Sequence, residues 1–239
     1  EALPTGTTYR FHTSRLTAND KPVFTGLLLA LGPGVDRPIS AWEEMFVPME
    51  LREHIRRITV PGPDGRPVPL VRSERTLFES TATPPPDAPP GWIPWYLALG
   101  AAVGGVALLL GRWSASGGAR TALRWLAGLW GLAAGVAGVV LAGLWGFTDH
   151  AMAYRNENLF QANPGALLLP VLLAIWGRGR DRAGRRASEV AAALAVVSAA
   201  GCLVQALPGF DQVNGPIIAL ALPIHLGIAG ALGSATARD

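Results

Sequence analysis

Residues 122–147, ALRWLAGLWGLAAGVAGVVLAGLWGF, decide the fold of this chain. The stretch carries one charged residue, Arg124, and otherwise consists of alanine, glycine, leucine, valine, tryptophan and phenylalanine. A helix needs about 20 predominantly apolar residues to cross the roughly 30 Å hydrocarbon core of a bilayer. The stretch exceeds that length and therefore predicts a transmembrane helix.

Four further apolar segments lie on either side of it. They cover residues 95–111, 166–177, 187–207 and 216–233, and the segment at 166–177 is short for a full crossing. Half of the 239 residues are hydrophobic, 15% are charged and mean hydropathy is +0.30, a balance that does not suit a soluble globular protein. The sequence predicts a mostly α fold: a polytopic membrane bundle of about five helices.

The chain divides into three parts by composition. Residues 1–82 are polar and mixed, and they predict an α+β region outside the membrane helices. Residues 83–94 are rich in proline, which fixes φ and removes donors, so they predict a stiff linker. Residues 95–234 form the predicted transmembrane helical domain.

Local patterns predict the elements of the polar part. The apolar run at 22–31 is too short to span a bilayer and predicts a buried helix or strand. Ser40 and Glu43 have the spacing of a capping box, which predicts a helix start. Residues 48–58 predict a second helical turn that begins at a proline, and residues 59–71 predict a hairpin with Asp-Gly at its bend.

The distribution of arginine predicts the orientation in the membrane. The connections after the second and fourth segments hold only Arg155, whereas those after the first and third are rich in arginine. Because short cytoplasmic loops are enriched in Lys and Arg, the polar part and the loop at 146–165 are expected to lie outside, and the carboxy terminus is expected to lie in the cytoplasm. The tryptophans agree, with one set near each predicted boundary: Trp92, Trp95 and Trp145 outside, and Trp113, Trp125 and Trp176 inside.

The connection GFTDHAMAYRNENLFQANPG, residues 146–165, is the most polar stretch between two membrane segments. Long ordered loops are commonly functional, and a histidine can transfer a proton near neutral pH. We therefore predict catalytic roles for Asp149 and His150. The neighbouring amides are predicted to bind substrate: Asn156, Asn158, Gln161 and Asn163. The alternative is that these residues only cap helix ends and form turns.

Three other residues are singled out by their surroundings. His225 lies inside the last apolar segment, so it is either a substrate-binding residue near the outer mouth or a neutral histidine bonded to a backbone carbonyl. His54 is expected to be solvated on the charged side of its helix. Cys202, the single cysteine, is expected to be a small buried hydrophobe. No metal-ligand spacing or phosphate-binding loop is present, so no metal and no cofactor are expected.

Several strings together resemble one bacterial family. They are LPTGTTYRFHTSR, DRPISAWEEMFVPMELREHIRRI, GRPVPLVRSERTLFES and the outer loop FTDH…YRNENLFQANP. This combination resembles the Lnb-type proteins, and the likeness covers nearly the whole chain. The stretches WEEMFVPMELR and TDH…N.NL…NP are its specific part.

The resemblance implies a periplasmic thiol domain, similar to papain-like amidases and acyltransferases, followed by helices in the bacterial inner membrane. Residues 1–82 would then be a partial periplasmic α+β region, the carboxy-terminal part of that domain. Such proteins are linked to N-acylation of lipoproteins: a cysteine would take an acyl chain from a phospholipid and pass it to a lipoprotein amine. The family's nucleophile lies upstream of the Pro-Thr-Gly stretch at which this chain begins. The chain is therefore expected to be the carboxy-terminal part of a longer protein and inactive by itself.

Three functions remain open at this point. The first is acyl transfer at the periplasmic face, with phospholipid and a membrane-anchored lipoprotein as substrates. The second is a non-catalytic membrane anchor or partner-docking module. The third, a transporter, would require intramembrane charges that the segments almost entirely lack. Nucleic acid is not an expected partner, because the net charge of +3 is scattered along the chain.

Overall fold

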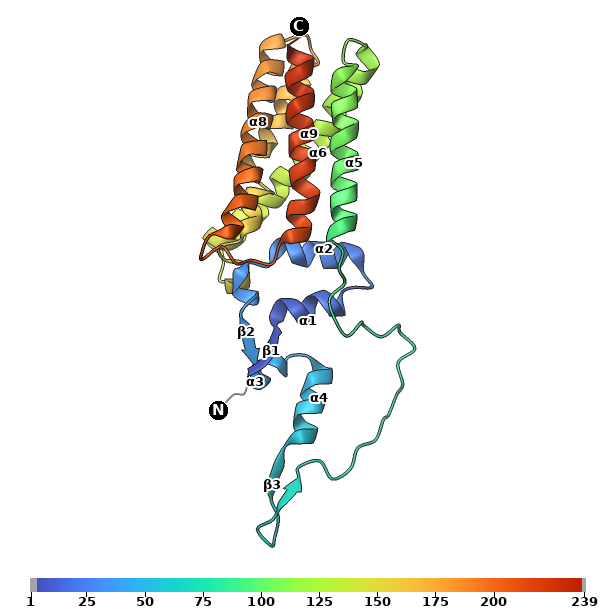
Figure 1. Cartoon of the computed structure of the whole chain (residues 1–239), viewed down its shortest axis with the longest axis vertical. Coiled ribbons are helices and arrows are strands. Elements are labelled where there is room, and N and C mark those ends of the chain that lie inside the picture. Colours follow the sequence, from blue (N-terminus) through green and yellow to red (C-terminus); the bar gives the residue numbers. More distant parts are fainter. Residues whose placement is uncertain (1–3, 238–239) are drawn as a thin grey trace. The chain divides into compact units, whose positions relative to one another are not determined.

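The computed structural model describes residues 4–237, and these form two compact units (Figure 1). The polar unit holds the described residues up to Phe24 together with Val35–Pro90. The membrane unit holds Thr25–Gly34 together with the described residues from Gly91 onward. The short segment 25–34 therefore belongs with the membrane helices, although it lies far from them in the sequence.

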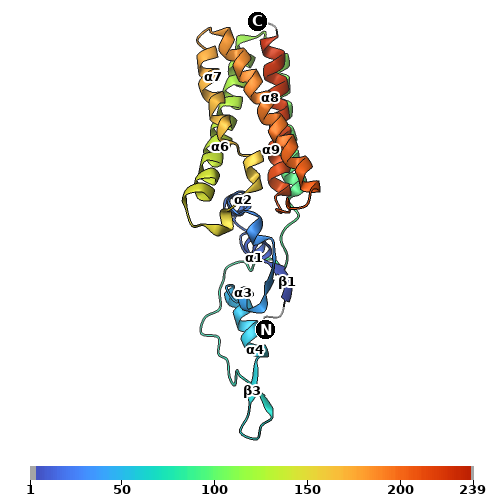
Figure 2. The same cartoon turned by 90° about the vertical axis from the view of Figure 1, so that its left-hand side faces the viewer.

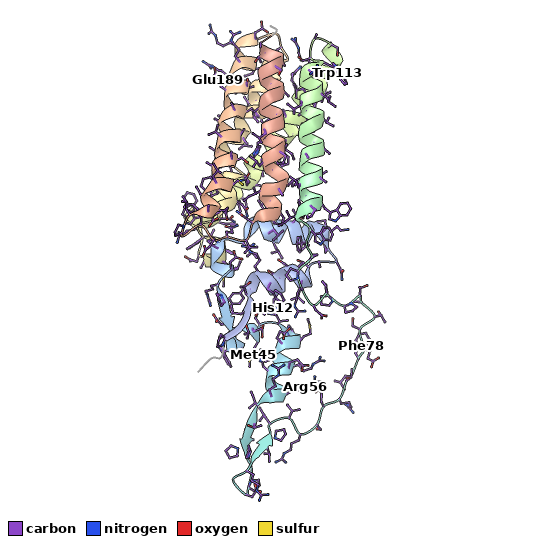
Figure 3. All side chains as sticks on the ribbon, viewed as in Figure 1. His12, Met45, Arg56, Phe78, Trp113 and Glu189 are labelled. Carbon is purple, nitrogen blue, oxygen red and sulfur yellow. The ribbon has the colours of Figure 1, made fainter. Side chains whose placement is uncertain are left out.

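The polar unit contains short helices and two small antiparallel sheets. In one sheet Pro4 pairs with Ser40, and in the other Val60 pairs with Val68. Residues 71–92 contain no helix or strand, and Figure 3 shows Phe78 on this extended segment. The elements are β1 (Pro4–Thr8), α1 (Tyr9–Leu16), β2 (Pro38–Ser40), α3 (Ala41–Glu44), α4 (Pro48–Arg57), β3 (Thr59–Pro61) and β4 (Pro67–Pro69).

The local patterns of the sequence are confirmed in this unit. The Ser40 hydroxyl accepts from the amide of Glu43 at 3.3 Å, and the Glu43 carboxylate accepts from the amide of Ser40 at 3.0 Å. This reciprocal pair is the predicted capping box, although α3 has only four residues. Helix α4 begins at Pro48, and the hairpin turns at Gly65, whose φ of 75° suits glycine.

The membrane unit contains five candidate membrane spans, which confirms the predicted polytopic bundle. Figure 2 shows α6, α7, α8 and α9 running lengthwise beside one another. The α-helices in these spans are α5 (Ile93–Arg112), α6 (Gly117–Phe147), α7 (Leu168–Trp176), α8 (Asp181–Leu203) and α9 (Gly215–Thr236). Helix α2 (Lys21–Ala30) is the shorter apolar helix, and η1 (Pro33–Val35) follows it.

The third span differs in its boundary from the expected one. Helix α7 covers only Leu168–Trp176, but the apolar span extends from Glu157 to Trp176 because two 3-10 turns precede the helix. These are η3 (Glu157–Phe160) and η4 (Pro164–Leu167). Half of the polar connection is therefore part of the third span.

The interior of the bundle is built from small and aliphatic side chains. Helix α5 packs along α9, and α8 packs along both α9 and α7. The core includes Ala107, Leu169, Ile228 and Leu232, all nearly inaccessible to solvent. Many large apolar side chains lie on the outside instead, among them Trp125 and Val196.

The expectation that Cys202 is buried was wrong, because the residue lies exposed on α8. The physical reason for this exposure is that lipid surrounds a membrane helix. Lipid tails are as apolar as the bundle interior, so a small apolar side chain gains little by facing inward. The apolar run around Cys202 therefore indicates a membrane helix without indicating which face of that helix is buried.

Candidate functional site

The polar connection between α6 and α7 is a folded structure held by its own side chains. Thr148 donates its hydroxyl to the carbonyl of Leu144 at 2.7 Å, and the Tyr154 hydroxyl donates to the carbonyl of Thr148 at 2.5 Å. The 3-10 turn η2 (Ala151–Ala153) lies between these two residues. Further along, the Asn163 side chain accepts from the amide of Gly165 at 2.9 Å. The connection therefore has a defined conformation.

Two predicted amides bind the end of helix α2. The Asn156 amide donates to the carbonyls of Leu29 and Ala30, each at 2.9 Å. The Asn158 amide donates to the carbonyls of Leu28 at 2.9 Å and Leu29 at 3.0 Å. The last carbonyls of a helix have no partner within it, so these amides satisfy groups that would otherwise be buried and unpaired.

Gln212, on the connection before α9, completes this amide clasp, which we define as Asn156, Asn158 and Gln212. Its side-chain amide donates to the carbonyl of Leu31 at 3.1 Å and to the Asn156 side chain at 3.2 Å. Gly32 closes the contact, because its amide donates to the carbonyl of Met152 at 2.8 Å. A Cβ at Gly32 would lie 2.3 Å from the carbonyl oxygen of Tyr154, so only glycine fits there.

The buried side chains of Glu157 and Gln161 lie beside the clasp and are paired, whereas Asn158 Oδ1 in the clasp has no hydrogen-bond partner among residues 4–237. Glu157 accepts at one carboxylate oxygen from Gln205 at 2.5 Å and at the other from the amide of Gln212 at 3.3 Å. Gln161 donates to the carbonyl of Ser198 at 3.0 Å and accepts from the Ser198 hydroxyl. These bonds join the polar connection to two distant segments. Gln205 and Gln212 lie between α8 and α9, and Ser198 lies on α8. No role was predicted for Gln205 and Gln212, since nothing in their spacing marks them.

Asp149 and His150 occupy the exposed end of the connection. Both side chains are accessible to solvent. The His150 ring lies within hydrogen-bond distance of the Thr148 hydroxyl, with Nδ1 at 3.1 Å. The structure thus separates the predicted residues by burial: Asn156, Asn158 and Gln161 are buried, Asn163 is half-buried, and Asp149 and His150 are exposed. Their catalytic and substrate-binding roles stay predictions.

His225 lies inside the bundle and does not join this group. Its side chain is 5% exposed and packs edge-on against the Trp130 ring, with centroids 5.7 Å apart. Within residues 4–237 no hydrogen-bond partner is found for His225 Nδ1 or for Trp130 Nε1, both of which are buried. The predicted substrate-binding role of His225 stays a prediction.

A pocket of about 440 Å³ lies in the membrane unit beside the connection. Arg155 lines it, and this residue has a φ of 54°, the left-handed conformation that residues other than glycine seldom adopt. Aromatic and aliphatic side chains supply most of the remaining wall. They include Trp145, Phe160, Val197 and Phe210. Arg155 stands out in the sequence as the one arginine of its connection, but the pocket forms only when α6, α8 and the two connections come together.

A second polar cluster lies in the polar unit and was missed by the sequence analysis. The Glu44 carboxylate lies 2.8 Å from His12 Nε2 and 2.7 Å from His54 Nε2, and it accepts from the Thr7 hydroxyl at 2.6 Å. Arg15 Nε donates to His12 Nδ1 at 3.3 Å. Figure 3 shows His12 on helix α1.

The expectation that His54 is solvated was wrong, because its side chain is 14% exposed and bound to Glu44. Helical periodicity placed His54 on the charged face of α4, but that face packs on the buried carboxylate. Burial raises the pKa of Glu44, and the hydrogen bonds from Thr7, His54 and His12 outweigh burial, so the pKa lies below its usual range. Among residues 4–237 no group of His, Cys, Asp and Glu could hold a metal ion.

Comparison with known proteins adds one finding. The family model described as the Lnb transmembrane domain matches residues 91–228, which is more than half of the chain. No curated protein and no solved structure matches the chain. The matched region begins just before α5 and ends within α9, so it includes the polar connection and its clasp. The chain is therefore a membrane protein that belongs to the Lnb family.

Proposed function

We propose that this chain is the membrane part of an acyltransferase that N-acylates lipoproteins at the periplasmic face of the inner membrane. The acyl chain would come from a phospholipid, and the acceptor would be the α-amine of a lipid-modified cysteine. One observation carries this proposal. Two buried amides of the polar connection donate to backbone carbonyls of helix α2, while Asp149 and His150 stay exposed at the end of a membrane helix.

The proposal assigns separate roles to the two groups of residues. Asn156, Asn158 and Gln161 position the connection, because each already donates to backbone carbonyls. His150 would accept the proton that the attacking amine loses, and Asp149 would hold the resulting imidazolium or the amine. The thiol nucleophile that the family resemblance implies cannot be Cys202, which lies on a membrane-spanning helix.

N-acylation is tested directly in a strain from which the native gene has been deleted. We expect a lipoprotein purified from that strain to carry a free α-amine. Restoring the full-length gene should add one acyl chain, measured as a mass increase of the amino-terminal lipopeptide. Identical lipopeptide masses in the two strains would refute acyl transfer as the function.

The orientation in this proposal rests on the arginine distribution. We expect a cysteine at Met152 to react with a membrane-impermeant maleimide added to intact cells, because Met152 is exposed on the polar connection. A cysteine at Arg180, which is exposed at the start of α8, should react only after the cells are opened. Both are placed in a Cys202→Ser background, since Cys202 is itself exposed. The reverse pattern would invert the proposed topology.

The amide clasp favours a second candidate function, a membrane anchor for the polar part of the protein. The clasp holds residues 28–31, and the chain continues from this segment into the polar unit on both sides. In that case the membrane unit would fix the position of the polar part without touching substrate. The two candidates differ in what they predict for His150, whose substitution should strongly reduce acyl transfer but leave an anchor function unchanged.

A further inference from the structure

We infer that the pocket of about 440 Å³ binds a glycerophospholipid, with Arg155 holding the phosphate group. This inference deepens the proposed function and rests on it, since it names the residue that would hold the acyl donor on the same polar connection as His150. It depends on three observations of the membrane unit: the backbone of Arg155, the charges around it and the aromatic wall of the pocket.

The backbone of Arg155 is held in an unfavourable conformation by its neighbours. Its φ of 54° is in the left-handed region, where the Cβ of an ordinary residue is crowded. The preceding Tyr154 is fixed by its hydroxyl bond to Thr148, and the following Asn156 is fixed in the clasp. Such outliers persist only where the surroundings impose them, and they cluster at ligand-binding sites. Glycine would adopt this φ without steric cost, so the presence of arginine indicates that its side chain has a function.

Arg155 is the charged side chain of this pocket that remains available to a ligand. It is exposed, and no carboxylate within residues 4–237 lies within ion-pairing distance of it. Glu157 also lines the pocket, but both of its carboxylate oxygens already accept hydrogen bonds from Gln205 and Gln212. A guanidinium presents a planar fork of donors that matches the oxygens of a phosphate, often bidentately.

The rest of the pocket fits the apolar part of a lipid. Phe160 and Phe210 lie with ring centroids 6.3 Å apart, and both line the pocket together with Val197 of α8. Trp145, near the end of α6, adds an aromatic ring where that helix leaves the apolar span. Aromatic rings at a membrane interface lie at headgroup level, with the alkyl chains beginning below them. A free phosphate would use none of this wall, so the pocket favours a phospholipid.

The test measures lipid binding to the purified full chain in detergent by native mass spectrometry. Three probes are added in turn: phosphatidylethanolamine, diacylglycerol with the same acyl chains, and glycerol 3-phosphate. We expect the phospholipid to bind at least about tenfold more tightly than either of the others, because only it offers both the phosphate and the chains. Equal binding of diacylglycerol, or equal binding of glycerol 3-phosphate, would overturn the inference.

Two variants test whether the Arg155 side chain is responsible for phospholipid binding. Arg155→Gly removes the guanidinium and relieves the left-handed backbone, so it should fold at least as well as the parent and lose the phospholipid preference. Arg178→Gln, an exposed arginine on the connection between α7 and α8, is the matched control and should bind like the parent. Unchanged phospholipid binding by Arg155→Gly would overturn the assignment. This assay needs no acyl transfer, so Arg155-dependent binding in a protein without N-acylation activity would contradict only the proposed function.

Discussion

His150→Ala in the full-length protein is expected to reduce lipoprotein N-acylation by about 10²-fold or more, while insertion into the membrane stays near normal. General acid or base catalysis by a positioned side chain is worth about 10²–10⁴-fold in rate. Among residues 4–237 the exposed His150 ring is hydrogen-bonded only to Thr148, so its removal leaves the clasp and the bundle core intact. The rate is measured from the mass shift of the amino-terminal lipopeptide over time.

The control for this experiment lies on the same turn. Met152 is 44% exposed and has no role in the proposed chemistry, so Met152→Ala should retain parental activity. Full activity in His150→Ala, together with full activity in the control, would mean that the connection serves only to hold α2. That result would support the anchor function, and the predicted catalytic roles of Asp149 and His150 would be wrong.

Gly104→Val is expected to prevent the bundle from forming its native packing. Helices α5 and α9 meet at this glycine, and a Cβ there would lie 2.3 Å from the carbonyl oxygen of Pro223. On the other side of the contact, a Cβ at Gly227 would lie 2.4 Å from the Gly104 Cα. Overpacking usually costs about 1–3 kcal/mol, and here the obstacle is backbone that cannot rotate away, so we expect about 3 kcal/mol or more.

The adjacent glycine supplies a control with the same change in helix propensity. A Cβ at Gly105 would meet nothing within 4 Å, so Gly105→Val should alter stability only through the helix backbone. The free energy of unfolding is measured for both variants by denaturant titration in detergent micelles. Equal stabilities of the two variants would show that the close approach of α5 and α9 does not hold the bundle together.

Residues 122–147 and the other apolar segments were sufficient to predict the class of fold and the number of membrane helices. The reason is that a bilayer imposes a length and a polarity on each spanning segment, and both can be counted along the chain. The capping box at Ser40 and the proline at the start of α4 were likewise visible, because caps depend on residues only a few positions apart.

Only the tertiary structure decided what the polar residues of the connection do. Asn156 and Asn158 were predicted to bind substrate, yet their amides meet carbonyls that lie more than a hundred positions away in the sequence. The left-handed backbone of Arg155 and the shared carboxylate of Glu44 are equally products of contacts between distant segments. Composition and spacing determine which segments enter the membrane. The partner of a buried polar group depends instead on which unpaired donors and acceptors the fold brings within about 3 Å, and the sequence does not encode that locally.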